Sequence, residues 1–142
     1  MKITRIEAIP INVPLKPGMT TKTSHGEHAT SPYVIVQVHT DEELTGLGEA
    51  TVAPRWSGET SQSCVAIVHG LIAPVLIGED PTRVNHLRRL IEGVIRLNPF
   101  TKAAVEMALW DLAGKAAGVP IYQLLGGKVR EEMPIRMVVG SI

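Results

Sequence analysis

The residues of this chain that could do chemistry lie in small, separate groups. The densest group contains His25, Glu27 and His28, which place three side chains able to bind a metal ion within four residues. Imidazole and carboxylate groups suit zinc, but a zinc site needs about four ligands, and no second His or Cys cluster supplies the others. We therefore expect no metal site in this stretch.

Two further pairs of reactive side chains have the wrong spacing for catalysis. Cys64 and His69 are five residues apart in a stretch with helical periodicity, so they lie about 140° apart around a helix and do not face each other. Glu106 and Asp111 have the same spacing, and we expect interface or capping contacts from them instead of an acid–base pair. We assign no catalytic residue to either pair.

The stretch GLGEA, residues 46–50, shares two glycines with phosphate-binding loops. Those loops have a third glycine and open a helix directly, and this stretch does neither. We expect close packing at the end of a strand, with Glu49 hydrogen-bonded at a domain junction.

Two polar stretches interrupt the apolar pattern of the chain. Residues 15–32 are rich in Thr, Ser, Gly, Pro and His and predict a long loop, and residues 53–58 predict a second loop with Arg55 and Trp56 exposed. A long structureless loop is uncommon in a compact domain and is usually functional or disordered. These loops are therefore the first candidates for binding residues.

The β-rich first part of the chain must hold these loops. Residues 2–13 predict a strand, and residues 33–40 and 44–52 predict a β-hairpin with an acidic turn. We expect the three strands to form one antiparallel sheet. In the first strand Ile3 and Ile6 are out of phase with the later apolar positions, which predicts a twist or a bulge.

Two amphipathic helices are predicted after the sheet. Ser57 or Thr60 can cap the first, and Pro74 is expected to break it. The second is expected to begin with Asp80 as N-cap and Pro81 in its first turn. The apolar positions that recur at helical spacing are Val65, Val68, Leu71 and Ile72 in the first helix and Val84, Leu87, Ile91 and Val94 in the second.

A third and longest helix is predicted after Asn98, which serves as N-cap before Pro99. Gly118 and Pro120 end this helix, and a second short helix follows and closes at two glycines. The apolar stripe of the long helix comprises Val105, Ala108, Leu109, Leu112 and Ala116. Residues 128–142 then return to a strand-like composition, and an apolar strand without a partner would expose an edge, which indicates the front part of a larger protein.

The composition excludes several classes of protein. The single Cys64 cannot form an internal disulfide, so we expect a reducing compartment and no secreted disulfide scaffold. Fourteen basic and fourteen acidic residues balance without a basic block, so we expect no nucleic-acid partner. The N-terminus lacks a signal-peptide core, and no stretch of about twenty apolar residues predicts a membrane span. We expect a soluble, cytoplasmic protein without a membrane partner.

Residues 105–127, VEMALWDLAGKAAGVPIYQLLGG, carry a recognisable combination of spacings. The run resembles the N-terminal signature of the mandelate racemase/muconate lactonizing enzyme family of the enolase superfamily, with an acid at Glu106, Asp111, and the adjacent Gly114 and Lys115. The KITRIEAIPINVPLK opening, GLGEA and GGKVRE also agree, so the resemblance covers essentially the whole chain. The NPFTKAAVEMALWD form is closer to the muconate cycloisomerase side of the family, although Thr101 stands where the signature usually has Ala.

The resemblance implies an α+β fold with two parts. Residues 1–127 would be the N-terminal capping domain, a three-stranded antiparallel sheet followed by a helical bundle. Residues 128–142 would be the linker and the first strand, at about 134–141, of a TIM-type (β/α) barrel that is otherwise missing from this chain. Relatives often place Ser or Thr where Val138 stands, so a close match to their substrates is not expected.

The resemblance also implies an activity. In this family a base removes the proton alpha to a carboxylate, and Mg²⁺ held by three acidic side chains of the barrel stabilises the enediolate. The outcome would be cycloisomerisation, racemisation or epimerisation by a homo-oligomeric isomerase, and this chain alone, without the barrel, would be inactive. The alternatives are an acid-sugar dehydratase of the mandelate racemase branch, or a stand-alone, non-catalytic α+β module for binding or oligomerisation.

The part of the site that the resemblance places on this chain is a lid. In the family the loops after the first and third strands close over the barrel mouth and select the substrate, and here they correspond to residues 15–31 and 53–58. We expect a cation near the distal end of a small carboxylate substrate and Trp56 covering it. The candidate substrate-binding residues are Lys16, Lys22, His25, His28, Arg55 and Trp56.

Overall fold

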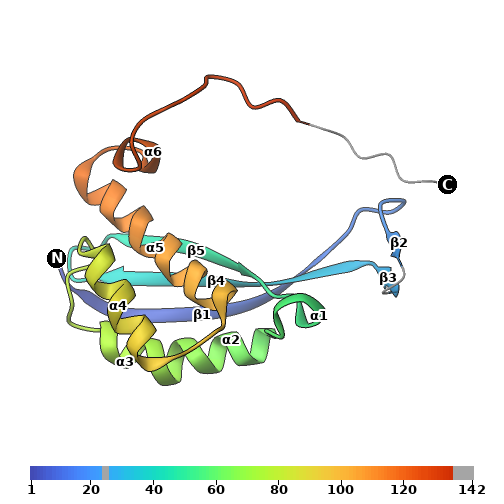
Figure 1. Ribbon diagram of the computed structural model, residues 1–142, viewed down its shortest axis with the longest axis horizontal. Helices are drawn as coiled ribbons and strands as arrows, with labels where there is room; N and C mark the ends of the chain where they lie inside the picture. The colour runs from blue at the N-terminus through green and yellow to red at the C-terminus, as the bar shows by residue number, and fades with distance from the viewer. Residues whose placement is uncertain (24–25, 136–142) are drawn as a thin grey trace.

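Helices cover one face of an antiparallel sheet in the computed structural model (Figure 1), which describes residues 1–23 and 26–135. The sheet contains the strands β1, β4 and β5 in that order, and β2 and β3 form a separate pair. The elements are β1 (Ile3–Pro14), β2 (Thr21–Thr23), β3 (Gly26–His28), β4 (Thr30–Thr40), β5 (Thr45–Thr51), α1 (Pro54–Ser57), α2 (Ser61–Ile67), the π-helical turn η1 (Val68–Ile72), α3 (Ala73–Leu76), α4 (Val84–Val94), α5 (Pro99–Ala117) and α6 (Ile121–Leu124). The predicted α+β fold is confirmed.

The sheet has the predicted connections, with β4 in the centre. Strand β1 pairs with β4, and β4 pairs with β5 through the tight turn after Thr40. The pairing of β1 with β4 shifts register between Ile3 and Arg5, which confirms the predicted bulge. The shift brings Ile3, Ile6 and Ala8 onto the face that the helices bury. The buried face also carries Val34, Val36 and Val38 of β4.

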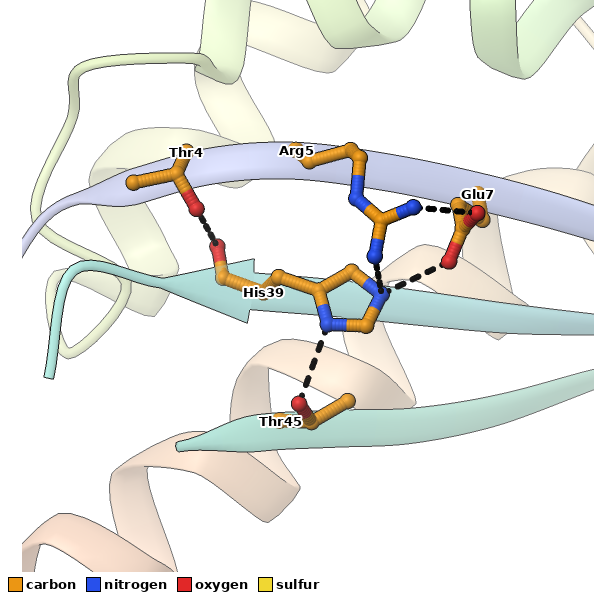
Figure 2. A network of polar contacts seen from close by, with 5 residues as sticks. All are labelled: Thr4, Arg5, Glu7, His39 and Thr45. Carbon is orange, nitrogen blue, oxygen red and sulfur yellow. Dashed lines mark hydrogen bonds and ion pairs between the residues drawn. The ribbon is translucent and has the colours of Figure 1, made fainter. Parts of the chain in front are cut away.

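The opposite face of the sheet carries a polar network that joins all three strands (Figure 2). His39 Nε2 lies 2.8 Å from Glu7 Oε2 and His39 Nδ1 lies 3.0 Å from Thr45 Oγ1. Arg5 Nη1 donates to Glu7 Oε1 at 2.6 Å, and Thr4 Oγ1 donates to the backbone carbonyl of His39 at 3.2 Å. These contacts hold the strands together at the end of the sheet nearer the N-terminus.

The long helix α5 packs directly on β5 because two glycines leave room for it. A Cβ atom at Gly48 would lie 1.9 Å from the carbonyl oxygen of Ala104, and one at Gly46 would lie 2.1 Å from that of Ala108. No real Cβ can approach an oxygen so closely, so only glycine fits here. The prediction that GLGEA marks close packing is confirmed.

Asp111 ties α5 to the edge strand β5, which is the interface contact predicted for it. Its Oδ2 accepts hydrogen bonds from the backbone N–H of Leu47 at 2.9 Å and from Lys115 Nζ at 2.6 Å. Lys115 Nζ also donates to the carbonyl of Thr45 at 2.6 Å. Glu106 takes no part in this contact, and its Oε2 lies 4.0 Å from Nε of Arg88.

The first predicted helix does not end at Pro74. Thr60 is its N-cap and forms a capping box with Ser63. The chain then widens into the π-helical turn, where the N–H of Ala73 donates to the carbonyl of Val68, and the helix continues to Leu76. The prediction of a break was wrong because a wider turn accommodates both the missing N–H and the ring of a proline.

The second predicted helix begins at Val84, and its N-cap position is Arg83, three residues after the predicted N-cap. Asp80 instead closes a local turn, in which its Oδ1 accepts hydrogen bonds from the N–H and the hydroxyl of Thr82 at 2.9 and 2.7 Å. These two bonds lower the pKa of the Asp80 carboxyl. The prediction was wrong because Asp caps turns as readily as helices.

The third predicted helix has the predicted bounds but a different cap. Asn98 occupies the N-cap position with a φ of 54°, yet its side chain donates to the carbonyl of Arg96 and not to the helix. The apolar stripe from Val105 to Leu112 is buried, whereas Ala116 is exposed. The short helix α6 follows as predicted.

The end of the chain lies partly outside the described residues. Residues 128–135 form neither helix nor strand, and the rest of the predicted barrel strand, including Val138, falls outside the part of the chain that the structure describes. In the described part of the chain, no helix combines the length and the apolar character needed to cross a membrane.

Replacing Gly48 by Ala tests the contact between α5 and β5. The new methyl group meets the backbone of Ala104, which cannot rotate away, so we expect the free energy of unfolding to fall by about 3 kcal/mol in urea titrations. Gly93→Ala in α4 is the matched control, because its Cβ meets no atom within 4 Å and should leave stability equal or higher. Equal stability of the two variants would contradict the packing argument.

Replacing His39 by Ala tests the network that joins the three strands. The change leaves Glu7 and Thr45 without their shared partner, so we expect a loss of about 1 kcal/mol in the free energy of unfolding. Gln37→Ala, two residues away on the same strand face and outside the network, should cost less. A loss for His39→Ala no larger than for this control would show that the network adds nothing to stability.

Candidate functional site

The two polar stretches lie at the same end of the sheet (Figure 1). Strand β1 ends there and β4 begins there, since Val13 pairs with Ser31. Strand β5 ends there as well, since Thr51 pairs with Tyr33, and the chain passes from β5 directly into α1. Antiparallel pairing thus brings together two segments that are distant in sequence.

The first stretch is an extended arm and not a loop. The arm, residues 15–23 and 26–29, contains the paired strands β2 and β3 and projects beyond the helices (Figure 1). A hydrogen bond of 3.0 Å from the N–H of Leu15 to the carbonyl of Ala29 closes its base. The prediction of a structureless loop was wrong, because Thr-rich strands can pair through their backbones without the apolar alternation by which strands are recognised.

The arm carries three of the predicted binding residues. Lys16 is exposed, and its carbonyl accepts the N–H of Met19 in a turn at 3.0 Å. Lys22 lies on β2 opposite Glu27. His28 is exposed on β3, with its Nε2 2.9 Å from Ser31 Oγ. His25 lies outside the described residues.

The second stretch carries the other two predicted residues on the single helical turn α1. Pro54 occupies its first position, and Gly58 ends it with a φ of 76°. Hydrogen bonds from Trp56 N to Ala53 O at 2.8 Å and from Gly58 N to Pro54 O at 3.1 Å close the turn. The predicted loop is therefore an ordered element with a defined direction for its side chains.

Trp56 and Arg55 are both exposed at this end of the molecule. Trp56 is 86% exposed, and Arg55 precedes it on α1. An indole ring offers a large flat apolar surface, and a guanidinium group offers donors in a planar fork that matches a carboxylate. The two side chains can therefore cover a ligand and bind its charge.

A pocket of about 510 Å³ lies at the foot of α1. Its polar lining comes from Asn12, Thr60, Ser61 and Gln62, and its remaining walls are prolines and Val52. None of these side chains carries a charge, so a carboxylate bound beside this pocket would need a cation from α1, from the arm or from another part of the protein.

Glu59 is the residue at this end that the sequence analysis missed. It is 1% exposed, and its Oε1 accepts the N–H of Phe100 at 2.9 Å, while its Oε2 accepts the N–H and the hydroxyl of Thr101 at 2.8 and 2.6 Å. Glu59 thus caps α5 in place of Asn98. Its partners lie 41 and 42 residues away, so no local pattern could reveal the contact.

Cys64 lies beside this cluster and is buried. Burial raises the pKa of its thiol, and a hydrogen bond with Thr101 offsets this only in part. A protonated thiol without solvent access is a poor nucleophile. His69 is exposed, so the two residues do not face each other, as the spacing predicted.

The described residues do not fit a metal ion. Among residues 1–23 and 26–135 no three His, Cys, Asp or Glu side chains lie close enough together to hold one. Mg²⁺ requires several oxygen ligands in near-octahedral geometry. We therefore derive no catalytic step through a metal on this part of the chain.

Comparison with protein families gives a direct match over most of the chain. Residues 4–126 match the model of the mandelate racemase/muconate lactonizing enzyme N-terminal domain. The matched range includes the sheet, the arm, α1 and α5.

Three characterised relatives show the range of the match. The N-succinyl-L-Arg/Lys racemase of Bacillus cereus is 33% identical over 97% of this chain and 37% of its own length, and its crystal structure superimposes with a TM-score of 0.89 over 95% of this chain and 36% of that chain. The chloromuconate cycloisomerase of Cupriavidus pinatubonensis is 39% identical over 99% of this chain and 38% of its own length. The cis-3-hydroxy-L-proline dehydratase of Roseibium aggregatum is 33% identical over 95% of this chain and 37% of its own length.

The chain spans between 37% and 38% of the length of these three relatives. The match to the family model, the sequence identities and the shared fold agree with the resemblance seen in residues 105–127. This chain therefore belongs to the mandelate racemase/muconate lactonizing enzyme family, of which it is an N-terminal domain.

Proposed function

We propose that this chain is the capping and substrate-specificity domain of a Mg²⁺-dependent isomerase that removes the proton alpha to a carboxylate. Residues 1–127 would form the cap, and residues 128–142 would be the linker and the first strand of a catalytic barrel. The observation that carries the proposal is the placement of the arm and α1 at one end of the sheet in a domain whose relatives include a racemase and a cycloisomerase.

The proposed chemistry assigns different tasks to the cap and the barrel. A proton alpha to a carboxylate is very weakly acidic, and its removal creates a second negative charge next to the first. A dication supplied by the barrel would stabilise that charge. The part of the cap would be to bind the substrate, orient it and exclude water, which strengthens electrostatic interactions in the closed site.

Within the cap, the residues proposed to meet the substrate come from residues 15–31 and from α1. Trp56 would cover the ligand, because nothing in the described chain buries its ring. The cationic groups proposed to face the carboxylate or the distal end of the substrate are Lys16, Lys22, His25, His28 and Arg55. We also propose that the substrate is a small carboxylate and that the enzyme is cytoplasmic and homo-oligomeric.

An acid-sugar dehydratase is the second candidate, because two relatives, at 33% and 38% identity, are named as dehydratases, and the second of them is a D-galactonate dehydratase. The two reactions share proton abstraction and differ in whether a leaving group departs afterwards. That difference depends on the base and the general acid, which we place in the barrel. The cap is therefore compatible with either outcome, and the barrel sequence would decide between them.

The gene itself provides a direct test of the two-part architecture. We expect the reading frame to continue past Ile142 for roughly 200 or more residues, which is the size of a barrel. A Lys-x-Lys pair on the second barrel strand would indicate an isomerase, and a His–Asp pair would indicate the mandelate racemase branch. A native protein of 15.3 kDa without a partner chain would favour the stand-alone module instead.

Substitution of the α1 residues tests the lid. In the full-length protein, Trp56→Ala and Arg55→Ala should each lower kcat/KM on the physiological carboxylate by about tenfold or more, because substrate cover and charge pairing are lost. Trp110→Phe is the matched aromatic control, because Trp110 lies half-buried on α5. Values of kcat/KM equal to those of the unmodified protein in both α1 variants would refute this role.

A further inference from the structure

Glu59 is a buried carboxylate that is not among the residues proposed to meet the substrate. The three hydrogen bonds to its side chain come from two backbone N–H groups and one hydroxyl of the first turn of α5. Among residues 1–23 and 26–135, no Lys, Arg or His forms an ion pair with it. Its charge is therefore stabilised by donated hydrogen bonds and by the positive end of the α5 dipole.

The contact requires a carboxylate and not only a side chain of that shape. Both oxygens of Glu59 act as acceptors, and all three of these partners are donors. Each oxygen of Glu59 accepts a backbone N–H, so a glutamine would place its NH₂ group against one of these donors in either orientation, and it would carry no charge for the helix dipole. The isosteric amide should therefore weaken the contact strongly.

Glu59 stands where the α1 segment returns to the body of the domain. Gly58 ends α1, the N–H of Glu59 donates to Ser57 Oγ at 3.2 Å, and Thr60 begins α2 as its N-cap. Trp56 lies three positions before Glu59 in the chain, with two residues between them, which limits the distance between their Cα atoms to about 10 Å. Fixing the carboxylate of Glu59 therefore restricts where the indole ring can lie.

We propose that Glu59 is a positioning residue that fixes α1, and with it Trp56 and Arg55, by binding the first turn of α5. Its side chain is directed into the domain and does not meet the substrate. It acts through the short chain that leads back to α1. This inference rests on the proposed function, since it assigns Glu59 a part in the same lid.

The motion of Trp56 tests the anchoring without any substrate. The full-length protein is prepared with Trp110→Phe and with any tryptophan beyond Ile142 also replaced by Phe, so that Trp56 is the fluorophore. In this background Glu59→Gln should lower the fluorescence anisotropy of Trp56, because α1 gains freedom of motion. Glu106→Gln is the matched control, a carboxylate-to-amide change on α5 whose partner Arg88 lies 4.0 Å away, and it should leave the anisotropy unchanged. An unchanged anisotropy in folded Glu59→Gln would overturn the proposal.

Kinetics test whether the anchoring matters for the substrate. Glu59→Gln should raise KM about tenfold with kcat within about twofold, because substrate binding must then order α1. In a background that carries both Trp56→Ala and Arg55→Ala, the same change should have little further effect, since the two side chains that Glu59 positions are then absent. If Glu59 were merely structural, the melting temperature would fall while kcat/KM per folded molecule stayed constant, and that result would overturn the proposal.

A milder variant covers the case in which Glu59→Gln fails to fold. Thr101→Val removes one of the three hydrogen bonds, so we expect a smaller fall in anisotropy and a rise in KM of about threefold, while Thr101→Ser should restore both. Anisotropy unchanged by Thr101→Val would overturn the anchoring. The proposed lid function and the proposed anchoring by Glu59 can fail separately. If the lid has no function, Trp56→Ala retains full activity. If Glu59 does not anchor the lid, Trp56 stays rigid in Glu59→Gln.

Discussion

The close approach of α5 to β5 is the contact on which the rest of this domain depends. The backbone of the helix lies where the Cβ atoms of Gly46 and Gly48 would be, so the helix packs directly on the edge strand. Two polar contacts then fix the helix along its length. Asp111 binds the backbone of β5 toward the C-terminal half of α5, and Glu59 binds the first turn. Apolar packing alone would let a helix slide or rotate, whereas these directional bonds define its place.

The two ends of the sheet carry different features. One end of the sheet is held by the network around His39. The other end carries the arm and α1 (Figure 1), where Lys16, His28, Arg55 and Trp56 are exposed. Binding residues on short segments supported by a rigid scaffold are a common arrangement in proteins. Glu59 links the two parts, since it belongs to the chain of α1 and to the cap of α5.

The same domain occurs in relatives named for a racemase, a cycloisomerase and a dehydratase reaction. Enzymes that catalyse different reactions can share a domain if that domain binds and encloses the ligand. The bond changes then take place in another part of the enzyme. The described residues of this chain offer exposed cationic and aromatic side chains at the end of the sheet where the arm and α1 lie.

The sequence by itself determined the elements whose signals are local. Alternating apolar residues specified the sheet, helical periodicity specified α5, and the motif of residues 105–127 specified the family. Local signals were misleading at Pro74 and Asp80, because a proline fits a π-helical turn and an aspartate can cap a turn instead of a helix.

Only the tertiary structure decided the features that depend on contacts between distant residues. Pairing of β4 with both β1 and β5 brought the arm and α1 to the same end of the sheet, and folding placed Glu59 against Thr101, 42 residues further along the chain. A carboxylate in a loop has no sequence pattern that distinguishes a solvated charge from a buried helix cap. The difference lies in which backbone N–H groups the folded chain brings within reach, and those groups are the same in every residue except proline.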